Sequence, residues 1–259
     1  MSKHHRAAGF TLLEIVVVVA VLAILATALT PTIIQRVVEA RVEATRAEEQ
    51  KLLEAMIGKS DGEGGYGFVG DIGRLPRAFG ELNQSSGLPL YNTQTTVRHV
   101  GIGWNGPYAN FGDSTTDAVN DAFGRPYTGA WQGQIRSAGP DGVAGNADDL
   151  VSPPSPVNIT GRIEVTVKAN LDGKVVIDPA GCAVQLYYAH NGTEAVLTDT
   201  QAPFIFENVP MGLHAIVVVG AAPKAGDIAA AAAAPTAALA QQTVASPGGG
   251  RTKLVEIWY

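Results

Sequence analysis

The sequence predicts an α+β protein with a long N-terminal helix, a small head and a C-terminal all-β sandwich. Residues 10–30 are almost wholly apolar, and Glu14 is the one charged residue among them. Residues 32–57 contain neither Gly nor Pro, which favours continuation of the same helix. Residues 157–259 contain short strand-like segments separated by turn residues, a pattern typical of a β-sandwich.

These observations set the expected domain boundaries. We expect a leader at residues 1–9, a membrane-spanning half of the helix at 10–30, and a head at 31–151 that includes the continuing helix. The sandwich covers residues 157–259 and carries an Ala- and Gly-rich insertion at 221–250. The Pro-rich residues Ser152–Pro156 between head and sandwich are expected to form a semi-rigid linker.

The apolar stretch admits three interpretations. Its basic tip, Lys3–Arg6, holds that end in the cytoplasm, and about 20 apolar residues suffice to cross a bilayer. The stretch is a secretory signal cleaved near Ala26–Ala28, a plain membrane anchor, or a helix in which Glu14 has a function. A carboxylate inside a membrane helix costs about 2.5–3.5 kcal/mol and is usually a paired, functional group. This cost favours the third interpretation.

The helix is expected to run from Phe10 to Ile57, roughly 70 Å at 1.5 Å per residue, and to end at Gly58. Its second half is amphipathic, with one face to bury. The expected buried face comprises Ile34, Val38, Val42, Thr45, Leu52 and Met56. The other faces carry the charges of Arg36, Glu39, Arg41, Glu43, Arg46, Glu48 and Glu49.

The segment Gly9-Phe10-Thr11-Leu12-Leu13-Glu14 resembles the processing site of type IV pilins and type II secretion pseudopilins. The resemblance implies that prepilin peptidase cleaves after Gly9, that Phe10 becomes the methylated N-terminus, and that Pro31 is a helix-bending proline. The amine of a neighbouring subunit would then neutralise Glu14 at low dielectric, which favours self-assembly and fixes the register.

The head is expected to be mostly irregular. The Gly- and Asp-rich residues 60–73 are expected to form a loop. Two aromatic motifs, Trp104–Tyr108 and Asn120–Tyr127, combine Gly and Pro with rings that plug a small core. They resemble signatures of the major pseudopilin of type II secretion, with Ala122 where a Pro is common.

Residues Ile135–Leu150 form an acidic, Gly-rich segment of the kind that binds Ca²⁺ through carboxylates and carbonyls. Its spacing does not fit an EF-hand, and a polar turn without an ion is the alternative. It resembles the calcium loop of the major pseudopilin. That resemblance implies side-chain ligation by Asp141 and Asp148, with Asp149 as a weaker candidate. Further oxygens would come from the carbonyls near Arg136, Ala138 and Val143.

The C-terminal part is expected to contain seven strands. They are Arg162–Lys168, Lys174–Ile177, Val184–Ala189, Ala195–Thr198, Phe204–Glu207, Leu213–Val219 and Lys253–Trp258. Residues 204–212 resemble a stretch of carboxypeptidase-regulatory-like sandwich modules, which serve as spacers or interaction surfaces. Residues 221–250 are expected to form a surface excursion with room for a short helix capped by Asp227.

Composition argues against several function classes. The net charge is −6 and no basic cluster stands outside the leader, so nucleic-acid binding has little support. Cys182 is the single cysteine, which precludes an intramolecular disulfide and a Cys-based metal site. The five histidines are isolated, and nucleophile-elbow, HExxH and P-loop motifs are absent, so an enzyme is not expected.

The sequence therefore predicts a structural subunit of a type II secretion pseudopilus or a type IV pilus-like filament. The chain is expected in the bacterial inner membrane with its bulk in the periplasm or in an extracellular filament. Expected partners are copies of itself, prepilin peptidase, inner membrane lipid and the secretion or pilus assembly machinery. The alternatives are a membrane-tethered binding module and a minor tip subunit that contacts cargo through the sandwich.

Overall fold

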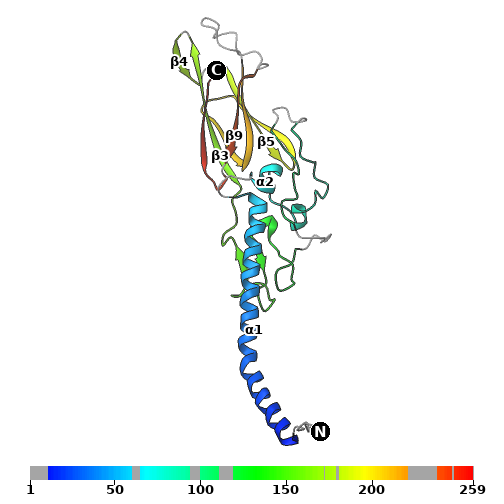
Figure 1. Cartoon of the computed structure of the whole chain (residues 1–259). Coiled ribbons are helices and arrows are strands. Elements are labelled where there is room, and N and C mark those ends of the chain that lie inside the picture. Colours follow the sequence, from blue (N-terminus) through cyan, green and yellow to red (C-terminus); the bar gives the residue numbers. More distant parts are fainter. Residues whose placement is uncertain are drawn as a thin grey trace, which may run out of the picture.

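The computed structural model describes residues 11–59, 65–93, 100–110, 119–171, 173–178, 181–220, 238–246 and 248–258. Side chains at 26, 28–31, 171, 238 and 239 lie outside this description. The molecule is elongated (Figure 1). A long helix, α1, leads from the N-terminal end to the head, which surrounds its second half, and the β-sandwich lies at the far end. The fold is α+β, as the sequence predicts.

Helix α1 (Leu12–Ile57) is 46 residues long and confirms the predicted continuous helix. Thr11 is its N-cap, and the Thr11 hydroxyl accepts a hydrogen bond of 3.2 Å from the backbone N–H of Glu14. Gly58 ends the helix with φ of 79°, a conformation that glycine adopts without steric cost, and its N–H donates to the Glu54 carbonyl at 2.8 Å. The N-terminal part of the helix curves (Figure 1).

The second half of α1 is buried by the head, and the first half is not. Thr45, Leu52 and Met56 are buried, as predicted, whereas Ile34 is 58% exposed, so the predicted stripe begins too early. The assignment of Glu49 to a solvent-facing side was wrong, because this residue is only 2% exposed. Glu49 shares the helix face of Thr45, Leu52 and Met56 through steps of three and four residues.

Short elements build the head around α1. They are α2 (Gly67–Ile72), the 3₁₀ helices η1 (Phe79–Leu82) and η2 (Ala130–Gln132), and the antiparallel pair β1 (Ile135–Ser137) and β2 (Leu150–Ser152). The prediction of a loop throughout residues 60–73 was wrong for α2. Phe68, Val69 and Ile72 of α2 are fully buried, so burial of these side chains offsets the weak helix propensity of its two glycines.

The two aromatic motifs supply core side chains, as predicted. Trp104, Tyr108 and Tyr127 all join the cluster formed by the end of α1 and by α2. The rings of Phe68 and Tyr108 meet edge to face with centroids 5.6 Å apart. The Tyr127 hydroxyl lies 3.0 Å from the Glu48 carboxylate, which ties this motif to α1.

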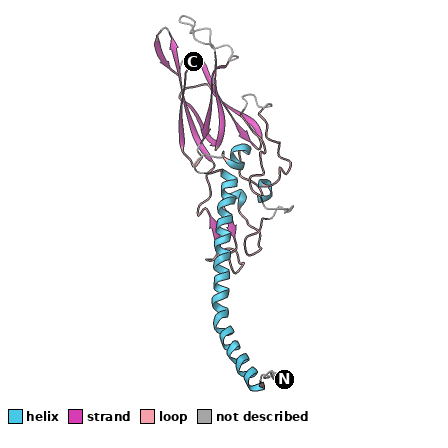
Figure 2. Ribbon diagram, viewed as in Figure 1, coloured by secondary structure: helices cyan, strands magenta, loops and turns pink. Residues whose placement is uncertain are grey.

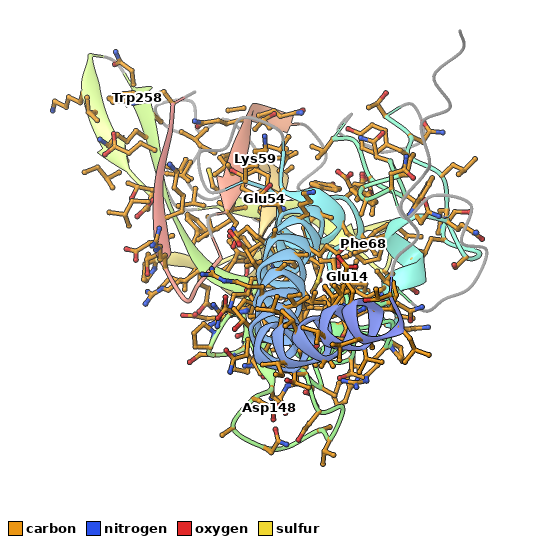
Figure 3. The ribbon with its side chains drawn as sticks, turned by 60° about the horizontal axis from the view of Figure 1, so that its bottom comes forward. Glu14, Glu54, Lys59, Phe68, Asp148 and Trp258 are labelled. Atoms are coloured by element: carbon orange, nitrogen blue, oxygen red, sulfur yellow. The ribbon has the colours of Figure 1, made fainter. Side chains whose placement is uncertain are left out.

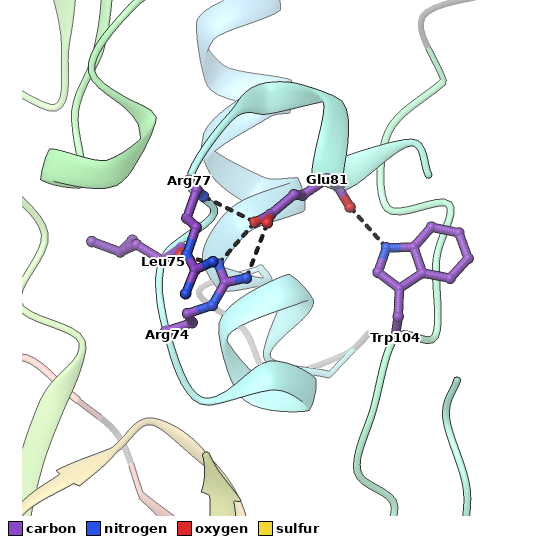
Figure 4. A network of polar contacts seen from close by, with 5 residues as sticks. All are labelled: Arg74, Leu75, Arg77, Glu81 and Trp104. Carbon is purple, nitrogen blue, oxygen red and sulfur yellow. Dashed lines mark hydrogen bonds and ion pairs between the residues drawn. The ribbon is translucent and has the colours of Figure 1, made fainter. Parts of the chain in front are cut away.

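A buried ion pair orders the segment after α2 (Figure 4). Two Arg74 nitrogens donate to the two Glu81 carboxylate oxygens at 2.8 and 3.0 Å, and the Arg77 N–H adds a third bond at 2.9 Å. Burial alone would raise the pKa of Glu81, but these bonds outweigh it and hold the pKa below its ordinary value. The Trp104 indole N–H donates to the Glu81 carbonyl at 2.7 Å, so the same turn fixes the first aromatic motif.

Two sheets form the sandwich (Figure 2). The first has the order β10-β3-β4, and β7 also pairs with β3; the second has the order β6-β5-β8-β9. The strands are β3 (Thr160–Leu171), β4 (Lys174–Ile177), β5 (Cys182–His190), β6 (Thr193–Asp199), β7 (Phe204–Pro210), β8 (Gly212–Gly220), β9 (Ala238–Ser246) and β10 (Thr252–Trp258).

The sandwich core lies between the two sheets, where alternate side chains face inward. Ile163, Val165 and Val167 of β3 are at most 1% exposed, which confirms the predicted alternation. The pairing of β10 with β3 is parallel, and the other pairs are antiparallel. Cys182 is buried in this core.

Strand β9 corrects the prediction for residues 221–250. The sequence analysis placed a surface excursion there, but residues Ala238–Ser246 pair with β8 over most of their length. Asp227 and the proposed short helix lie outside the described residues. The linker Ser152–Pro156 contacts the head, because the Gln134 side-chain amide donates to the carbonyls of Pro153 and Pro154, both at 3.2 Å.

Glycines allow the head and the sandwich to approach closely. The N–H of Gly192, in the turn between β5 and β6, donates to the Ile72 carbonyl at 2.9 Å. A Cβ added at Gly73 would lie 1.9 Å from the Ala189 carbonyl oxygen, and one added at Gly212 would lie 2.9 Å from the Gly70 carbonyl oxygen. The sandwich is therefore packed directly on α2.

Candidate functional site

The first half of α1 carries an extended exposed apolar surface. Leu12 is 84% exposed, Val19 58% and Ile24 68%. The large apolar residues of this surface that are more than 45% exposed are Leu12, Leu13, Ile15, Val16, Val17, Val18, Val19, Val21, Leu22, Ile24, Leu25, Ile33, Ile34 and Val37. A contiguous apolar surface of this kind is typical of an interface. Within the described part of the chain, no helix is both long and apolar enough to cross a membrane.

Glu14 lies in the first turn of α1, within this exposed apolar surface (Figure 3). Its backbone N–H is satisfied by Thr11, and its side chain is exposed. Among the described residues its carboxylate has neither a hydrogen bond nor an ion pair. A negative charge is favourable near the positive end of a helix dipole. Gly9 and Phe10, the predicted processing and methylation residues, lie outside the described residues.

The acidic loop brings Asp141 and Asp148 together. The Asp148 carboxylate accepts a bond of 3.1 Å from the N–H of Asp141. The two oxygens of Asp141 accept bonds from the Val143 N–H at 2.8 Å and from the Asn146 side-chain amide at 2.7 Å. Asp148 lies in this loop at the side of α1, away from Trp258 of the sandwich (Figure 3).

Asp149 differs from the other two carboxylates. One of its oxygens accepts a bond of 2.7 Å from the Gly145 N–H. Its other oxygen, Oδ1, is buried and has no hydrogen-bond partner in the described structure. An orphaned buried carboxylate oxygen is costly unless a donor or a cation satisfies it.

The predicted carbonyl ligands take part in the backbone of the head. The Arg136 carbonyl accepts from the Thr128 N–H at 3.0 Å, and the Ala138 carbonyl accepts from the Gly142 N–H at 3.1 Å. Each carbonyl has a second lone pair. Within the described residues, no group of three or more His, Cys, Asp or Glu side chains is arranged to hold a metal ion. A cation here would need carbonyl oxygens in addition to the carboxylates.

Sequence reasoning missed the side chain that supports this loop, Arg125. Its guanidinium donates to the carbonyls of Gly139 and, at 3.3 Å, of Pro140. The Asp121 carboxylate in turn accepts bonds of 2.9 Å from the N–H groups of Phe123 and Arg125. The signal lay in the second aromatic motif, where Asp121 precedes the Phe-Gly-Arg turn and fixes its shape.

Glu49 is a second feature that the sequence analysis missed. Burial raises the pKa of Glu49 to about 7; the positive charge of Arg46 opposes this rise, and the negative charge of Asp121 adds to it. The Oε1 atom of Glu49 is buried without a hydrogen-bond partner in the described structure. The contact face of α1 in the head therefore includes a carboxyl group that titrates near neutral pH.

Comparison with known proteins points to the N-terminal segment. Residues 4–30 match the family model described as the prokaryotic N-terminal methylation motif, whereas no curated protein matches the chain. The matched range contains Gly9, Phe10 and Glu14. The motif implies leader removal by prepilin peptidase, methylation and assembly into pilus-like filaments, and it occurs in structural subunits. The match is confined to the N-terminal segment, which is thus similar to the N-terminal segment of type IV pilin-like proteins.

Proposed function

We propose that this chain is a structural subunit of a type II secretion pseudopilus or a type IV pilus-like filament. The observation that carries the proposal is the position of the exposed apolar surface. Most of it lies within the methylation motif, residues 4–30, and it stops where the head begins to bury α1. A subunit with this layout hides the apolar half-helix in inner membrane lipid before assembly and against other copies of α1 afterwards.

Glu14 has a specific role in this mechanism. Removal of the leader after Gly9 creates a positive amine on Phe10, and Glu14 is the carboxylate nearest to it in sequence. In the filament, the amine of one subunit pairs with Glu14 of its neighbour. Removal of one partner from a buried ion pair is strongly destabilising because it leaves an unpaired charge. The pair therefore favours one register between subunits.

The substitution Glu14→Ala tests this role. The variant is expected to be processed and membrane-bound, but to form filaments at least about a hundredfold less than the unchanged chain, because breaking a buried pair costs about 3–5 kcal/mol. The measurement is the amount of subunit in sheared filaments against the amount in membranes. Glu39→Ala, at an exposed position of the same helix, is the control and should assemble normally. Normal filaments from Glu14→Ala would refute the mechanism.

Electron microscopy separates this function from the alternatives. Filaments built mainly of this chain support a major subunit. A subunit present in filaments at low stoichiometry indicates a minor tip subunit whose sandwich meets cargo. A processed membrane protein that never enters filaments indicates a membrane-tethered binding module.

We also propose a calcium ion in the acidic loop. Asp141, Asp148 and Asp149 would contribute carboxylate oxygens, and the carbonyls near Arg136, Ala138 and Val143 would complete the ligand set. The orphaned, buried Oδ1 of Asp149 supports the proposal because a cation there would satisfy it. The Arg125 guanidinium lies at the base of the loop and would repel a bound cation. The ion would therefore bind on the side of the loop away from Arg125.

Thermal unfolding with Ca²⁺ and with EDTA tests the calcium proposal. A ligand that binds only the native state stabilises it by about 2.7 kcal/mol at a hundredfold excess over Kd, so Ca²⁺ should raise Tm. The variant Asp148→Asn should lose most of the rise, and Mg²⁺ should produce less of it because Mg²⁺ gives up its water reluctantly. Equal Tm values with Ca²⁺ and with EDTA would contradict the calcium proposal.

A further inference from the structure

The sheet centred on β3 has a free edge on each side. The Arg162 N–H donates to the Arg251 carbonyl at 2.9 Å, and the pairing with β10 is parallel and in register. The N–H and C=O groups of Leu254, Glu256 and Trp258 therefore point away from β3. No strand pairing or backbone hydrogen bond in the described part of the chain reaches this outer edge of β10.

Strand β4 forms the upper part of the opposite edge. The Asp178 N–H, next to the strand, donates to the Val167 carbonyl of β3 at 2.7 Å. The alternation of β4 then directs the N–H and C=O groups of Val175 and Ile177 away from β3. For the residues that the structure describes, β4 pairs with β3 alone.

The same residues expose apolar side chains on one face of the sheet. Leu254 is 70% exposed and Trp258 53%, while Val175 is 56% and Ile177 61% exposed. Trp258 pairs with Lys168 of β3, and Lys168 pairs with Ile177, so these three side chains form one row across the outer face. The two free edges thus carry matching apolar side chains on the same face.

Trp258 is held in position for such a contact. The Lys168 ammonium lies 5.3 Å from the centroid of the Trp258 ring and 2.7 Å from the Glu256 carboxylate. Strand β10 has neither a proline nor an irregularity in its register with β3, which are common devices against edge-to-edge pairing.

We propose that β10 of one subunit pairs with β4 of the next and extends the sheet from copy to copy. This inference rests on the proposed filament function. Because β10 runs parallel to β3 and β4 runs antiparallel to it, copies that point the same way bring β10 and β4 together antiparallel. The contact joins two different surfaces, so it does not close on itself and suits a filament.

Charge supports the same neighbour. Arg251 and Lys253 lie at the start of β10. Glu207 of β7, with a side chain 59% exposed, lies on the lower part of the edge that β4 continues. Glu207 and Glu164 both pair with Arg162 at 3.3 Å, so this group of three side chains keeps one excess negative charge. In the proposed contact the basic start of β10 approaches Glu207 of the next subunit, while Trp258 approaches Val175 and Ile177. Pairing between two β10 strands would instead require a two-fold axis, and such a contact would close on itself as a dimer.

Cross-linking within assembled filaments tests the contact. The full-length variant Ile177→Cys/Trp258→Cys is assembled, treated with a short bis-maleimide, and separated by denaturing electrophoresis, because these two residues lie on the same row of the extended sheet. The expected result is a ladder of dimers, trimers and longer products. Each single variant should remain monomeric, as should Val196→Cys/Trp258→Cys, which uses an exposed residue of β6 in the other sheet. The native Cys182 is buried and is present in all samples.

The outcomes are distinct. A ladder from the Ile177/Trp258 pair alone supports the proposal. A dimer from a separate Leu254→Cys variant, with its cysteine near the middle of β10, indicates two-fold pairing of β10 and overturns it. Intact filaments without cross-links overturn it but leave the proposed function in place, whereas an unmodified chain that forms no filaments contradicts the proposed function itself.

A charge substitution gives an independent readout. Leu254→Lys/Trp258→Lys places two further positive charges on the free edge, and we expect roughly tenfold less sheared filament at equal membrane level. Both residues are exposed, so the Tm of the subunit should change little. Val196→Lys is the matched control. Unchanged filament yield from the double variant would contradict the contact.

Discussion

Glu49 and His214 show how burial changes the chemistry of single residues. Glu49 stands in a charged run of α1 and is only 2% exposed, because helix periodicity places it on the buried face despite its charge. His214 in β8 is 1% exposed, and its Nε2 atom lies 2.8 Å from the Pro210 carbonyl. Burial lowers the pKa of His214 to about 4, although the bond to Pro210 opposes this shift. Both residues couple stability to pH, in opposite directions.

His214 should make the sandwich sensitive to acid. The unfolded chain binds a proton at His214 near pH 6.5, whereas the folded chain does so only near pH 4. The unfolded state therefore binds more protons between these values, and the free energy of unfolding should fall by about 3 kcal/mol as pH drops from 6.5 to 4. Urea unfolding of the full chain in detergent measures this slope. His214→Gln should flatten it, and His190→Gln, at an exposed position, should not.

Glu49 should give the opposite slope. Its pKa is raised to about 7 in the folded chain from 4.5, so the folded state binds more protons between these values. Stability from this group is fully present below pH 4.5 and is lost as pH rises through 7. Glu49→Gln should therefore reduce the loss of stability of the head between pH 5 and 8. An unchanged pH profile in this variant would show that Glu49 does not titrate as burial predicts.

At the scale of elements, a strong hydrophobic periodicity was sufficient to predict a helix or a strand, whereas the residue composition of a segment was not. The alternation of β3 and the length of α1 were both evident in the sequence. Strand β9 was missed because its Ala, Gln and Thr residues resemble the low-complexity segment before it, and its place beside β8 comes from tertiary pairing. Helix α2 was missed because its glycines are turn formers, although three of its six residues are buried.

The junction between α2 and the sandwich depends on Gly73. Its φ is +80°, and an added Cβ would lie 1.9 Å from the Ala189 carbonyl oxygen. Gly73→Ala should therefore destabilise the chain by roughly 3 kcal/mol through strain and displacement of β5. Gly87→Ala is the control, because Gly87 has a φ of +82° but nothing within 4 Å of its added Cβ. We expect a cost of only about 1 kcal/mol there. Equal shifts of Tm for the two variants would argue against a close junction.

At the scale of the whole molecule, the chain has three parts that differ in how their apolar side chains are buried. The second half of α1 is covered by the head, the sandwich has its own core, and the first half of α1 stays exposed (Figure 1). The sequence could predict these three parts, because each has a distinct hydrophobic pattern. It could not predict how the sandwich sits on the head, since that depends on glycine contacts between segments far apart in sequence.

The acidic loop illustrates the same limit at the candidate site. Asp141, Asp148 and Asp149 were predicted as ligands from the resemblance to a pseudopilin calcium loop, and the loop does place Asp141 next to Asp148. Arg125 was not recognisable, because it reaches the Gly139 and Pro140 carbonyls from a separate turn. The resemblance thus supplied the candidate ligands, whereas the Arg125 guanidinium that supports the loop could be found only from the fold.

Mass spectrometry of the mature N-terminus tests the central claim most directly. The claim is that the leader ends at Gly9 and that Glu14 stays in the mature chain beside a charged amine. The account predicts a chain that begins with N-methylated Phe10. A mature chain that begins near Leu29, after a signal cleaved at Ala26–Ala28, would lack Glu14 and the apolar half of α1 and would contradict the account.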